Sequence, residues 1–366
     1  MGLIRILLAL AVADFHSHTM TLSSHVLDLG WVNGEIAVQT FFVISGFYMA
    51  LILSGKYVGK GALAFYRARL LRLFPGYWLA CIMTILVLLV TQEVNVFAYW
   101  RELSARHQWS DLTCNLLLNL FFMGQEWTML LDRGHLHYLL VPQAWTLSIE
   151  VSFYLMAPWL IRRHTLTLAA LAGILLVARG VLFRAGLLDY ESSCFIPPLE
   201  LVWFLLGTLS YRAYAFAAPQ LKDAGLGLVL AASLAVMIVA FPQTIGLHFE
   251  LGRGWGPAGN YILQAVTAVA LPFIFAATRN SRIDALLGDL SYPLYVCHVA
   301  VLEYIISLGV GLYRGEMIMV ASIVVAIAFA ILLAPVERWR AWLFERNAVE
   351  TGDAGLRGGM RARAGH

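Results

Sequence analysis

Long apolar segments follow one another along this chain from one end to the other. A helix crosses the hydrocarbon core of a bilayer with about 20 mostly apolar residues. Gly and Pro interrupt several of the segments, which membrane helices tolerate where neighbouring helices or water satisfy the freed backbone groups. The pattern predicts an all-α integral membrane protein of about ten transmembrane helices, beginning near Leu3, Ile36, Gly76, Trp145, Leu166, Leu199, Leu226, Tyr261, Tyr292 and Met317.

Two apolar segments have features that set them apart from ordinary spans. Residues 1–13 resemble a secretory signal peptide, because Arg5 precedes a short apolar run and Ala11-Val12-Ala13 resembles a cleavage site. The apolar pattern continues past that point, which favours an uncleaved first transmembrane helix. The connection from Glu93 to Ala144 contains an apolar run, Leu112 to Met123, that is too short to span. We predict a re-entrant or interfacial segment there.

Basic residues concentrate on one side of the predicted spans. An even number of spans places both termini on the same side, and an inner N-terminus puts most of the 25 Lys and Arg residues inside. Cytoplasmic loops carry such an excess, so both termini are predicted to be cytoplasmic in a multi-pass protein of the plasma (inner) membrane. We divide the chain into a membrane domain, 1–345, and a disordered cytoplasmic tail, 346–366, which is rich in Gly, Arg and Ala.

Composition excludes several classes of protein. The chain is 60% hydrophobic and 13% charged, unlike a soluble domain, and a net charge of +3 is too small to indicate nucleic-acid binding. The four cysteines form no C-x-x-C pair and no zinc spacing, so no metal site is predicted. Cys114 and Cys194 fall on the predicted outer side, where buried free thiols and a disulfide are both compatible with the pattern.

Ionisable residues inside predicted spans are costly and mark candidate functional sites. Arg5 and His16 are eleven residues apart, so on a helix they point the same way, separated by ~16 Å along the axis. Glu150, near the start of the fourth span, has the same predicted depth as His16. A hydrogen-bonded pair in which Glu150 orients the imidazole is one interpretation, and separate structural contacts for each residue are the other.

The second and ninth predicted spans contain further candidates. Ser45 and Gly46 form a small pair near mid-depth, followed by Phe47. Small residues allow close approach of a ligand or of another helix, and helix packing is the simpler explanation. His298 lies in the ninth span after Ser291-Tyr292-Pro293, where a purely structural polar contact is an alternative to a functional role.

The segment after the second span is strongly basic, with Lys56, Lys60, Arg67, Arg69 and Arg72. Membrane topology and anionic lipid headgroups explain such a segment without any ligand. The sharper hypothesis is that Arg69 and Arg72, three residues apart and therefore neighbours on a helix, clamp phosphates. Coenzyme A presents phosphates of this kind.

Together these patterns resemble the integral-membrane acyltransferase 3 family. They occur in the family's order and cover the chain from Arg5 to about Pro335. Each is weak alone and the set is specific. The matching patterns are Arg5 and His16 with ten residues between them, the run from Phe41 to Phe47, Arg69-x-x-Arg72 before Pro75, Trp145 to Glu150 followed by Phe153-Tyr154 and Pro158, and Ser291 to Tyr295 followed by His298.

The resemblance implies a ten-helix domain that moves acyl groups, most often acetyl, from cytoplasmic acyl-CoA to hydroxyls of glycans or related metabolites. It implies that His16 is the catalytic histidine, that Arg5 is its partner across the motif, and that Arg69 and Arg72 are the arginines on the cytoplasmic, acyl-CoA side. The predicted catalytic residues are therefore His16 as general base, Glu150 and Arg5. The chain departs from the family's pattern at Gln39 and Val151, where acidic residues are frequent. The predicted acyl-CoA site comprises Arg67, Arg69, Arg72, Ser45, Gly46, Phe47, Tyr292 and His298.

The resulting hypothesis is an acyl-CoA-dependent O-acyltransferase that holds no bound cofactor and uses acyl-CoA, in the first place acetyl-CoA, as co-substrate. Its expected partners are a glycan or lipid-linked sugar acceptor and the lipid bilayer, while oligomerisation stays open. A secondary transporter or flippase is the main alternative, because intramembrane charges and broken helices also mark transport pathways. A sensor or scaffold whose charged residues lock helices together is a second alternative.

Overall fold

A computed structural model describes residues 1–21, 29–59, 61–91, 95–131, 138–217, 224–241, 258–309 and 314–350. Within these ranges every regular element is a helix, which confirms the all-α prediction. The elements are α1 (Gly2–Thr21), α2 (Gly34–Leu53), α3 (Ala62–Thr91), α4 (Asn95–Ala105), α5 (Trp109–Phe121), α6 (Gln125–Leu131), η3 (Pro142–Ala144), α7 (Trp145–Leu160), α8 (Thr165–Arg184), α9 (Tyr190–Ser193), α10 (Pro197–Ala217), α11 (Ala224–Val239), α13 (Ala258–Thr278), α14 (Arg282–Ser307) and α15 (Arg314–Glu350).

The helices identify a membrane protein. Each of the ten predicted segments begins inside a different helix: α1, α2, α3, α7, α8, α10, α11, α13, α14 or α15. In the described part of the chain, 6 helices are long and apolar enough to cross a bilayer: Gly34–Leu53, Ala62–Thr91, Thr165–Arg184, Gly259–Thr278, Arg282–Ser307 and Arg314–Arg340. Ten crossings and cytoplasmic termini stay predictions.

Two helices begin earlier than predicted. Helix α3 starts at Ala62 rather than near Gly76, so Arg69 and Arg72 lie on a helix that continues through Pro75. Helix α14 starts at Arg282, ahead of Tyr292. Hydropathy finds the part of a helix that matches the hydrocarbon core, whereas backbone hydrogen bonding continues into the polar turns beyond it.

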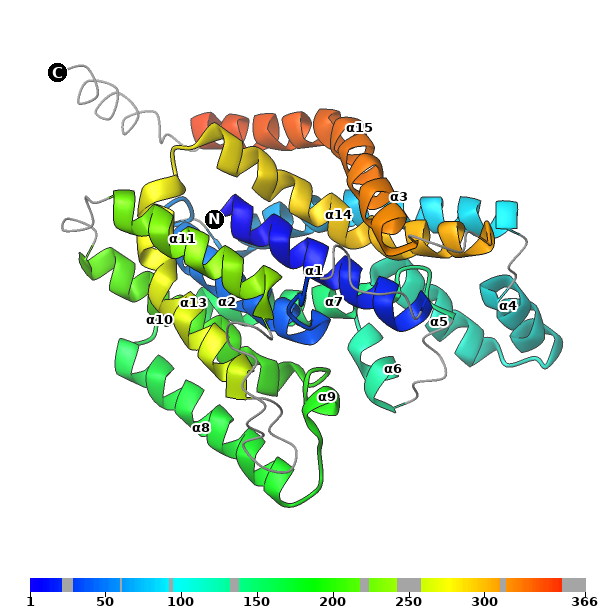
Figure 1. Ribbon diagram of the computed structural model, residues 1–366, viewed down its shortest axis with the longest axis horizontal. Helices are drawn as coiled ribbons and strands as arrows, with labels where there is room; N and C mark the ends of the chain where they lie inside the picture. The colour runs from blue at the N-terminus through cyan, green and yellow to red at the C-terminus, as the bar shows by residue number, and fades with distance from the viewer. Residues whose placement is uncertain are drawn as a thin grey trace.

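Helix α1 lies at the centre of the bundle, beside α14 and α2 (Figure 1). It is continuous through Ala13, which is 1% exposed, so the segment that resembles a cleavage site is part of the packed core. The backbones of α1 and α14 approach closely: a Cβ added at Gly2 would lie 1.6 Å from the carbonyl oxygen of Asp284. Small residues therefore set the contact between these two helices.

The crossing of α2 and α10 also depends on glycine. A Cβ at Gly46 would lie 2.1 Å from the Phe204 carbonyl oxygen, and one at Gly207 would lie 1.8 Å from that of Val43. Close helix packing is therefore the role of Gly46, in agreement with the simpler of the two interpretations of the Ser45-Gly46 pair.

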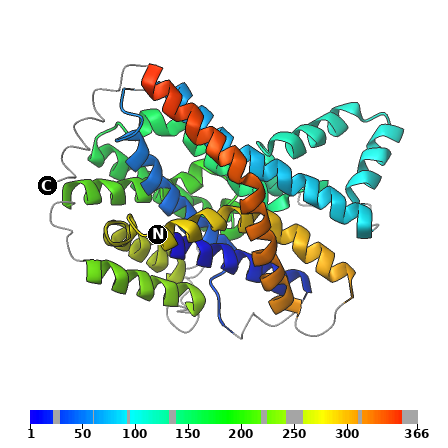
Figure 2. The ribbon, with the colours of Figure 1, turned by 90° about the horizontal axis from the view of Figure 1, so that it is seen from above.

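The predicted re-entrant run corresponds to α5. Together with α4 it lies at the edge of the bundle, beside the far end of α3 (Figure 2). The Tyr77 hydroxyl of α3 donates a hydrogen bond of 2.6 Å to the Asn119 carbonyl of α5. Leu117 and Leu120 face outward and are about half exposed. Whether α5 inserts into the membrane or lies at the membrane interface stays a prediction.

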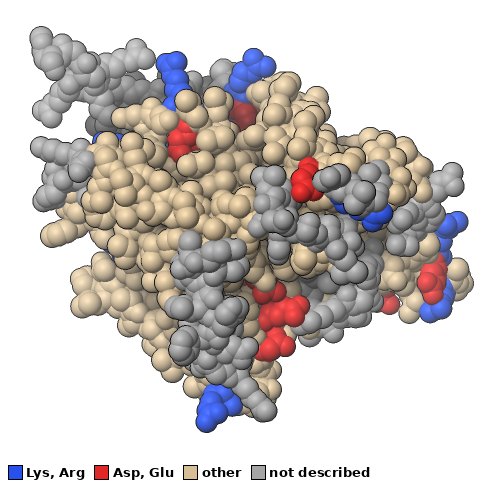
Figure 3. Space-filling model, viewed as in Figure 1, with Lys and Arg blue, Asp and Glu red and all other residues tan. Residues whose placement is uncertain are grey.

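The outer surface is largely uncharged. On the face drawn in Figure 3, charged side chains stand in separate small groups within a mainly uncharged surface. Large apolar side chains such as Leu166, Val177 and Ile331 are more than half exposed. A surface of this kind suits lipid rather than water.

One buried ion pair joins α8 to α10. Arg179, which is fully buried, donates to the Glu200 carboxylate over 3.0 Å and to the Ser193 hydroxyl over 2.5 Å. Cys194 lies beside this network, accepting a long hydrogen bond from Gln39. Of the two alternatives for the outer cysteines, the free thiols hold: Cys114 and Cys194 are both free, with Cys194 buried and Cys114 exposed.

The predicted tail begins inside α15, which continues to Glu350. Helix α15 thus extends past the predicted boundary at 346. The remainder of the predicted disordered tail, 351–366, lies outside the described residues.

Candidate functional site

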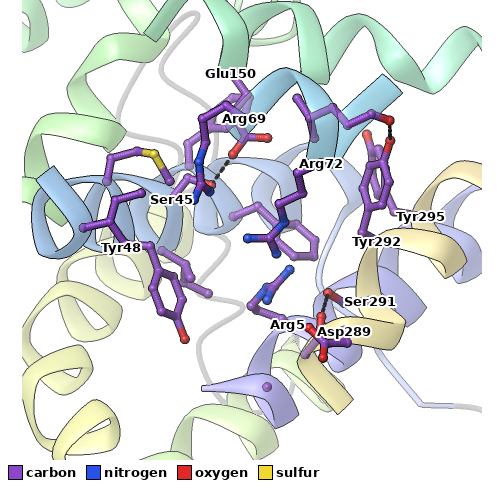
Figure 4. A pocket seen from close by; sticks show the side chains of 18 of the residues that line it. Arg5, Ser45, Tyr48, Arg69, Arg72, Glu150, Asp289, Ser291, Tyr292 and Tyr295 are labelled. Carbon is purple, nitrogen blue, oxygen red and sulfur yellow. Dashed lines mark hydrogen bonds between the residues drawn. The ribbon is translucent and has the colours of Figure 1, made fainter. Parts of the chain in front are cut away.

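A cavity of about 390 Å³ lies between α1, α2, α3, α7, α13 and α14 (Figure 4). It unites residues from separate predicted motifs. The predicted site residues that line it are Arg5, Ser45, Arg69, Arg72, Glu150 and Tyr292.

Three guanidinium groups define one part of this cavity. The three-residue spacing of Arg69 and Arg72 on α3 places both on one face of the helix, and Arg5 enters from α1. In Figure 4 the side chains of Arg5 and Arg72 point toward each other. Across the described ranges none of the three forms an ion pair, and Nε of Arg69 is buried without a hydrogen-bond partner. Like charges held together without an ion pair favour binding of an anion.

Glu150 lies beside Arg69 in the same cavity (Figure 4) and accepts hydrogen bonds from two side chains. The Ser45 hydroxyl and the Tyr154 hydroxyl each donate to its Oε1 over 2.6 Å. Tyr154 lies one helical turn further along α7, and Ser45 comes from α2. Glu150 therefore fixes the wall of the cavity between α2 and α7.

His16 lies outside the lining of the cavity. Its ring centroid is 5.1 Å from that of His298 on α14, at an interplanar angle of 63°. The two hydrogen bonds of Glu150 go to Ser45 and Tyr154, so the structure does not form the predicted pair between Glu150 and His16. Equal depth in the membrane specifies the height of two side chains but not their direction around the bundle axis.

Tyr295 separates the cavity from the two histidines. It lines the cavity, and its ring is 5.9 Å from that of His298 and 6.2 Å from that of Phe41. Its hydroxyl lies 2.7 Å from that of Thr146 and donates to the Gln143 carbonyl over 3.0 Å. Phe41 and Tyr295 thus form the wall on the histidine side.

Four residues of the predicted acyl-CoA site lie elsewhere. Phe47 is fully buried among aromatic rings, with that of Phe275 5.4 Å away, and Gly46 packs on α10. Arg67 is exposed beside the cavity rather than in it. His298 is fully buried next to His16.

Several lining residues were missed by the sequence analysis. Tyr48 and Tyr154 follow Ser45 and Glu150 by one helical turn, and this spacing is a signal that would have identified them. Asp284 and Asp289 also line the cavity. They went unnoticed because they precede the apolar part of α14. Over the described residues, no cluster of three His, Cys, Asp or Glu side chains is arranged to hold a metal ion.

Comparison with known proteins identifies a protein family that the chain matches. The family model described as an acyltransferase domain matches residues 1–336. Over 306 residues the chain is 22% identical to a Staphylococcus aureus (strain COL) protein named "Putative O-acetyltransferase SACOL0978". Over 309 residues it is 23% identical to O-acetyltransferase OatA of Staphylococcus aureus strain NCTC 8325. Each match covers 77% of this chain and 48% of the relative, so the chain spans about half the length of these curated relatives. No solved structure matches the chain.

Proposed function

The chain belongs to the integral-membrane acyltransferase 3 family. We therefore propose that it transfers an acyl group from cytoplasmic acyl-CoA to a hydroxyl, and acetyl is the acyl group that we favour. The acceptor is a glycan, a lipid-linked sugar or a related metabolite, and the site of action is the plasma membrane. The names of the relatives support O-acetyl transfer. The observation that carries the proposal is the cavity with three arginines that form no ion pair among the described residues.

Coenzyme A enters with its phosphates toward Arg69 and Arg72. Guanidinium groups bind phosphate oxygens bidentately, and Arg5 adds a third positive charge at the same cavity. The predicted topology places the start of α1 and of α3 at the cytoplasmic side, where acyl-CoA is available. Arg67, exposed on the preceding turn of α3, is left to interact with lipid headgroups or solvent.

The pantetheine arm follows the cavity away from the arginines. It passes Ser45, Glu150 and Tyr292 and reaches the wall formed by Phe41 and Tyr295. His16 lies ~16 Å beyond Arg5 along α1, at 1.5 Å per residue. A shift of the Tyr295 ring brings the thioester to His16, and the apolar surroundings keep water from it.

His16 acts as the general base. The acceptor oxygen attacks the thioester carbonyl carbon while the imidazole takes the hydroxyl proton. The carbon–sulfur bond then breaks, and the proton passes to the CoA thiolate, so the products are the ester and free CoA. Base catalysis of this kind contributes ~10² to 10⁴ in rate. In this scheme Glu150 acts on the binding of acyl-CoA and not on His16, because the hydrogen bonds that it accepts shape the cavity.

The test is release of free CoA thiol from acetyl-CoA by purified, detergent-solubilised protein, with a panel of glycan acceptors. His16→Ala is compared with wild type and with His18→Ala, a histidine change two residues along the same helix. We expect acceptor-dependent release from wild type and His18→Ala and none from His16→Ala. Equal release from all three would eliminate His16 as the base. No release and no CoA binding in folded wild type would favour the transporter.

A further inference from the structure

His16 and His298 stand on two neighbouring helices that run in the same direction. Helices α1 and α14 touch at Gly2 and Asp284 near their starts. Further along both helices the two imidazole rings meet edge to face, 5.1 Å between centroids. A residue from each helix is therefore brought to one place, beyond the wall of the donor cavity.

The hydrogen bonds of His298 specify its tautomer. Its Nδ1 lies 2.8 Å from the Tyr295 carbonyl oxygen. A carbonyl oxygen only accepts, so Nδ1 carries the proton and Nε2 of the neutral ring has a free lone pair. This Nε2 is buried without a hydrogen-bond partner. Leaving such a buried acceptor without a partner is destabilising.

The facing ring has a matching atom. Nδ1 of His16 is also buried without a hydrogen-bond partner. Hydrogen bonds of catalytic groups are often long in a free enzyme and shorten when substrate binds. A small turn of the His16 ring brings its Nδ1 to Nε2 of His298.

We infer that His298 is the positioning residue of His16: its Nε2 accepts a hydrogen bond from Nδ1–H of His16, which leaves Nε2 of His16 as the base for the acceptor hydroxyl. This inference rests on the proposed acyl transfer and replaces Glu150 as the partner of the base. The Tyr295 carbonyl holds His298, and His298 holds His16. The arrangement has the logic of a catalytic triad, in which the third group orients the histidine and stabilises its protonated form.

A neutral imidazole suits this role inside a membrane. A carboxylate in place of His298 would put a full negative charge in a buried spanning segment, which is costly. Between turnovers His16 is neutral, so that carboxylate would have no positive charge beside it. The proton from the acceptor stays on His16 until the thiolate takes it, so His298 keeps the same tautomer throughout the reaction.

Two substitutions of His298 separate this role from a structural one. In His298→Asn the amide nitrogen replaces Nδ1 as donor to Tyr295, but no atom reaches the position of Nε2. In His298→Gln the longer side chain places an amide oxygen near that position. We expect His298→Asn to lower kcat by roughly 10- to 100-fold, which is the usual loss when a residue that orients a metal ligand or a catalytic group is removed. The KM for acetyl-CoA and the thermal stability should stay unchanged. His298→Gln should regain part of kcat.

The opposite results are equally clear. Wild-type kcat in His298→Asn, beside an inactive His16→Ala, overturns the inference and leaves the proposed acyl transfer standing. A loss of stability shared by both His298 variants, with no recovery in His298→Gln, shows a structural role and also overturns it. A spectroscopic measurement tests the inference even if the purified protein shows no catalytic activity. In ¹⁵N-histidine-labelled protein we expect the His16 Nδ1–H signal to change in His298→Asn, and unchanged His16 signals would contradict the inference irrespective of activity.

Discussion

At the residue scale, the proposed binding of acyl-CoA in the cavity can be tested on individual arginines. Arg69 and Arg72 line it, while Arg67 on the same helix is exposed outside it. A hydrogen bond to a charged group contributes about 1.5–3 kcal/mol. We therefore expect Arg69→Gln or Arg72→Gln to raise KM for acetyl-CoA by roughly 10- to 100-fold, with kcat within a few fold of wild type.

Arg67→Gln is the matched control for this prediction, and steady-state kinetics with varied acetyl-CoA is the measurement. The control should leave KM nearly unchanged. Substitution by Lys should restore little, because an ammonium lacks the planar fork that binds phosphate bidentately. If Arg67→Gln raised KM as much as Arg72→Gln, the binding surface would be the exposed start of α3 and not the cavity.

The placement of Glu150 leads to a second prediction at this scale. Glu150→Gln retains an oxygen that can accept from Ser45 and Tyr154, but it removes a negative charge from the cavity in which we propose that the phosphates bind. We expect KM for acetyl-CoA to fall a few fold, with kcat nearly unchanged, in the same kinetic assay. A large drop in kcat alone would show that Glu150 acts on His16 after all.

Sequence reasoning identified many side chains of the candidate site but not which of them contact one another. Ionisable residues in apolar segments stand out, so Arg5, His16 and Glu150 were found, and His298 was noticed. Which of them meet depends on the rotation of each helix about its axis. That rotation is decided by packing contacts such as the one between Gly2 and Asp284, which a single sequence does not reveal.

At the scale of elements, close helix contacts determine the shape of the cavity. Gly46 and Gly207 hold α2 against α10, and Ser45 next to Gly46 lines the cavity. Overpacking a tight contact costs typically 1–3 kcal/mol. We expect Gly207→Ala to lower the thermal unfolding temperature measured in detergent. Gly173→Ala on α8, where an added Cβ meets nothing within 4 Å, should be neutral or slightly stabilising. Equal behaviour of the two variants would contradict the close α2–α10 contact.

The buried ion pair between α8 and α10 allows another stability test. Arg179 and Glu200 are both fully buried. Removing one member of such a pair leaves an uncompensated charge and costs about 3–5 kcal/mol, whereas replacing both by apolar residues is often neutral. We expect Arg179→Met to be strongly destabilised in thermal unfolding and the double variant Arg179→Met, Glu200→Leu to recover most of the loss. Similar instability of the single and double variants would refute this account.

Helix boundaries were the part of the elements that the pattern predicted least well. The spans of α3 and α14 were placed too late because charged residues interrupt the apolar pattern in their first turns. Those turns contribute Arg69, Arg72, Asp284 and Asp289 to the cavity. A site at the end of a membrane helix combines polar side chains with helical spacing, and hydropathy alone excludes it.

At the scale of the whole molecule, function and topology depend on each other. Acyl-CoA is available in the cytoplasm, so the proposed acyl transfer requires the start of α3, with the arginines of the cavity, to face the cytoplasm. The excess of Lys and Arg at this end predicts the same orientation. The connection that contains α5 must then lie on the outer side, because α3 runs from one side to the other.

The chain provides its own probe of this orientation. Of its four cysteines, Cys114 on α5 is exposed and the other three are buried. A membrane-impermeant maleimide added to intact cells should label Cys114, with Cys114→Ala as the control for background. In the Cys114→Ala background, a cysteine introduced by Arg67→Cys at the exposed start of α3 should react only after the cells are permeabilised. Labelling of both positions from outside would place the arginine cavity away from the supply of acyl-CoA, so the orientation and the proposed donor site would fail together, whereas the helical bundle itself would be unaffected.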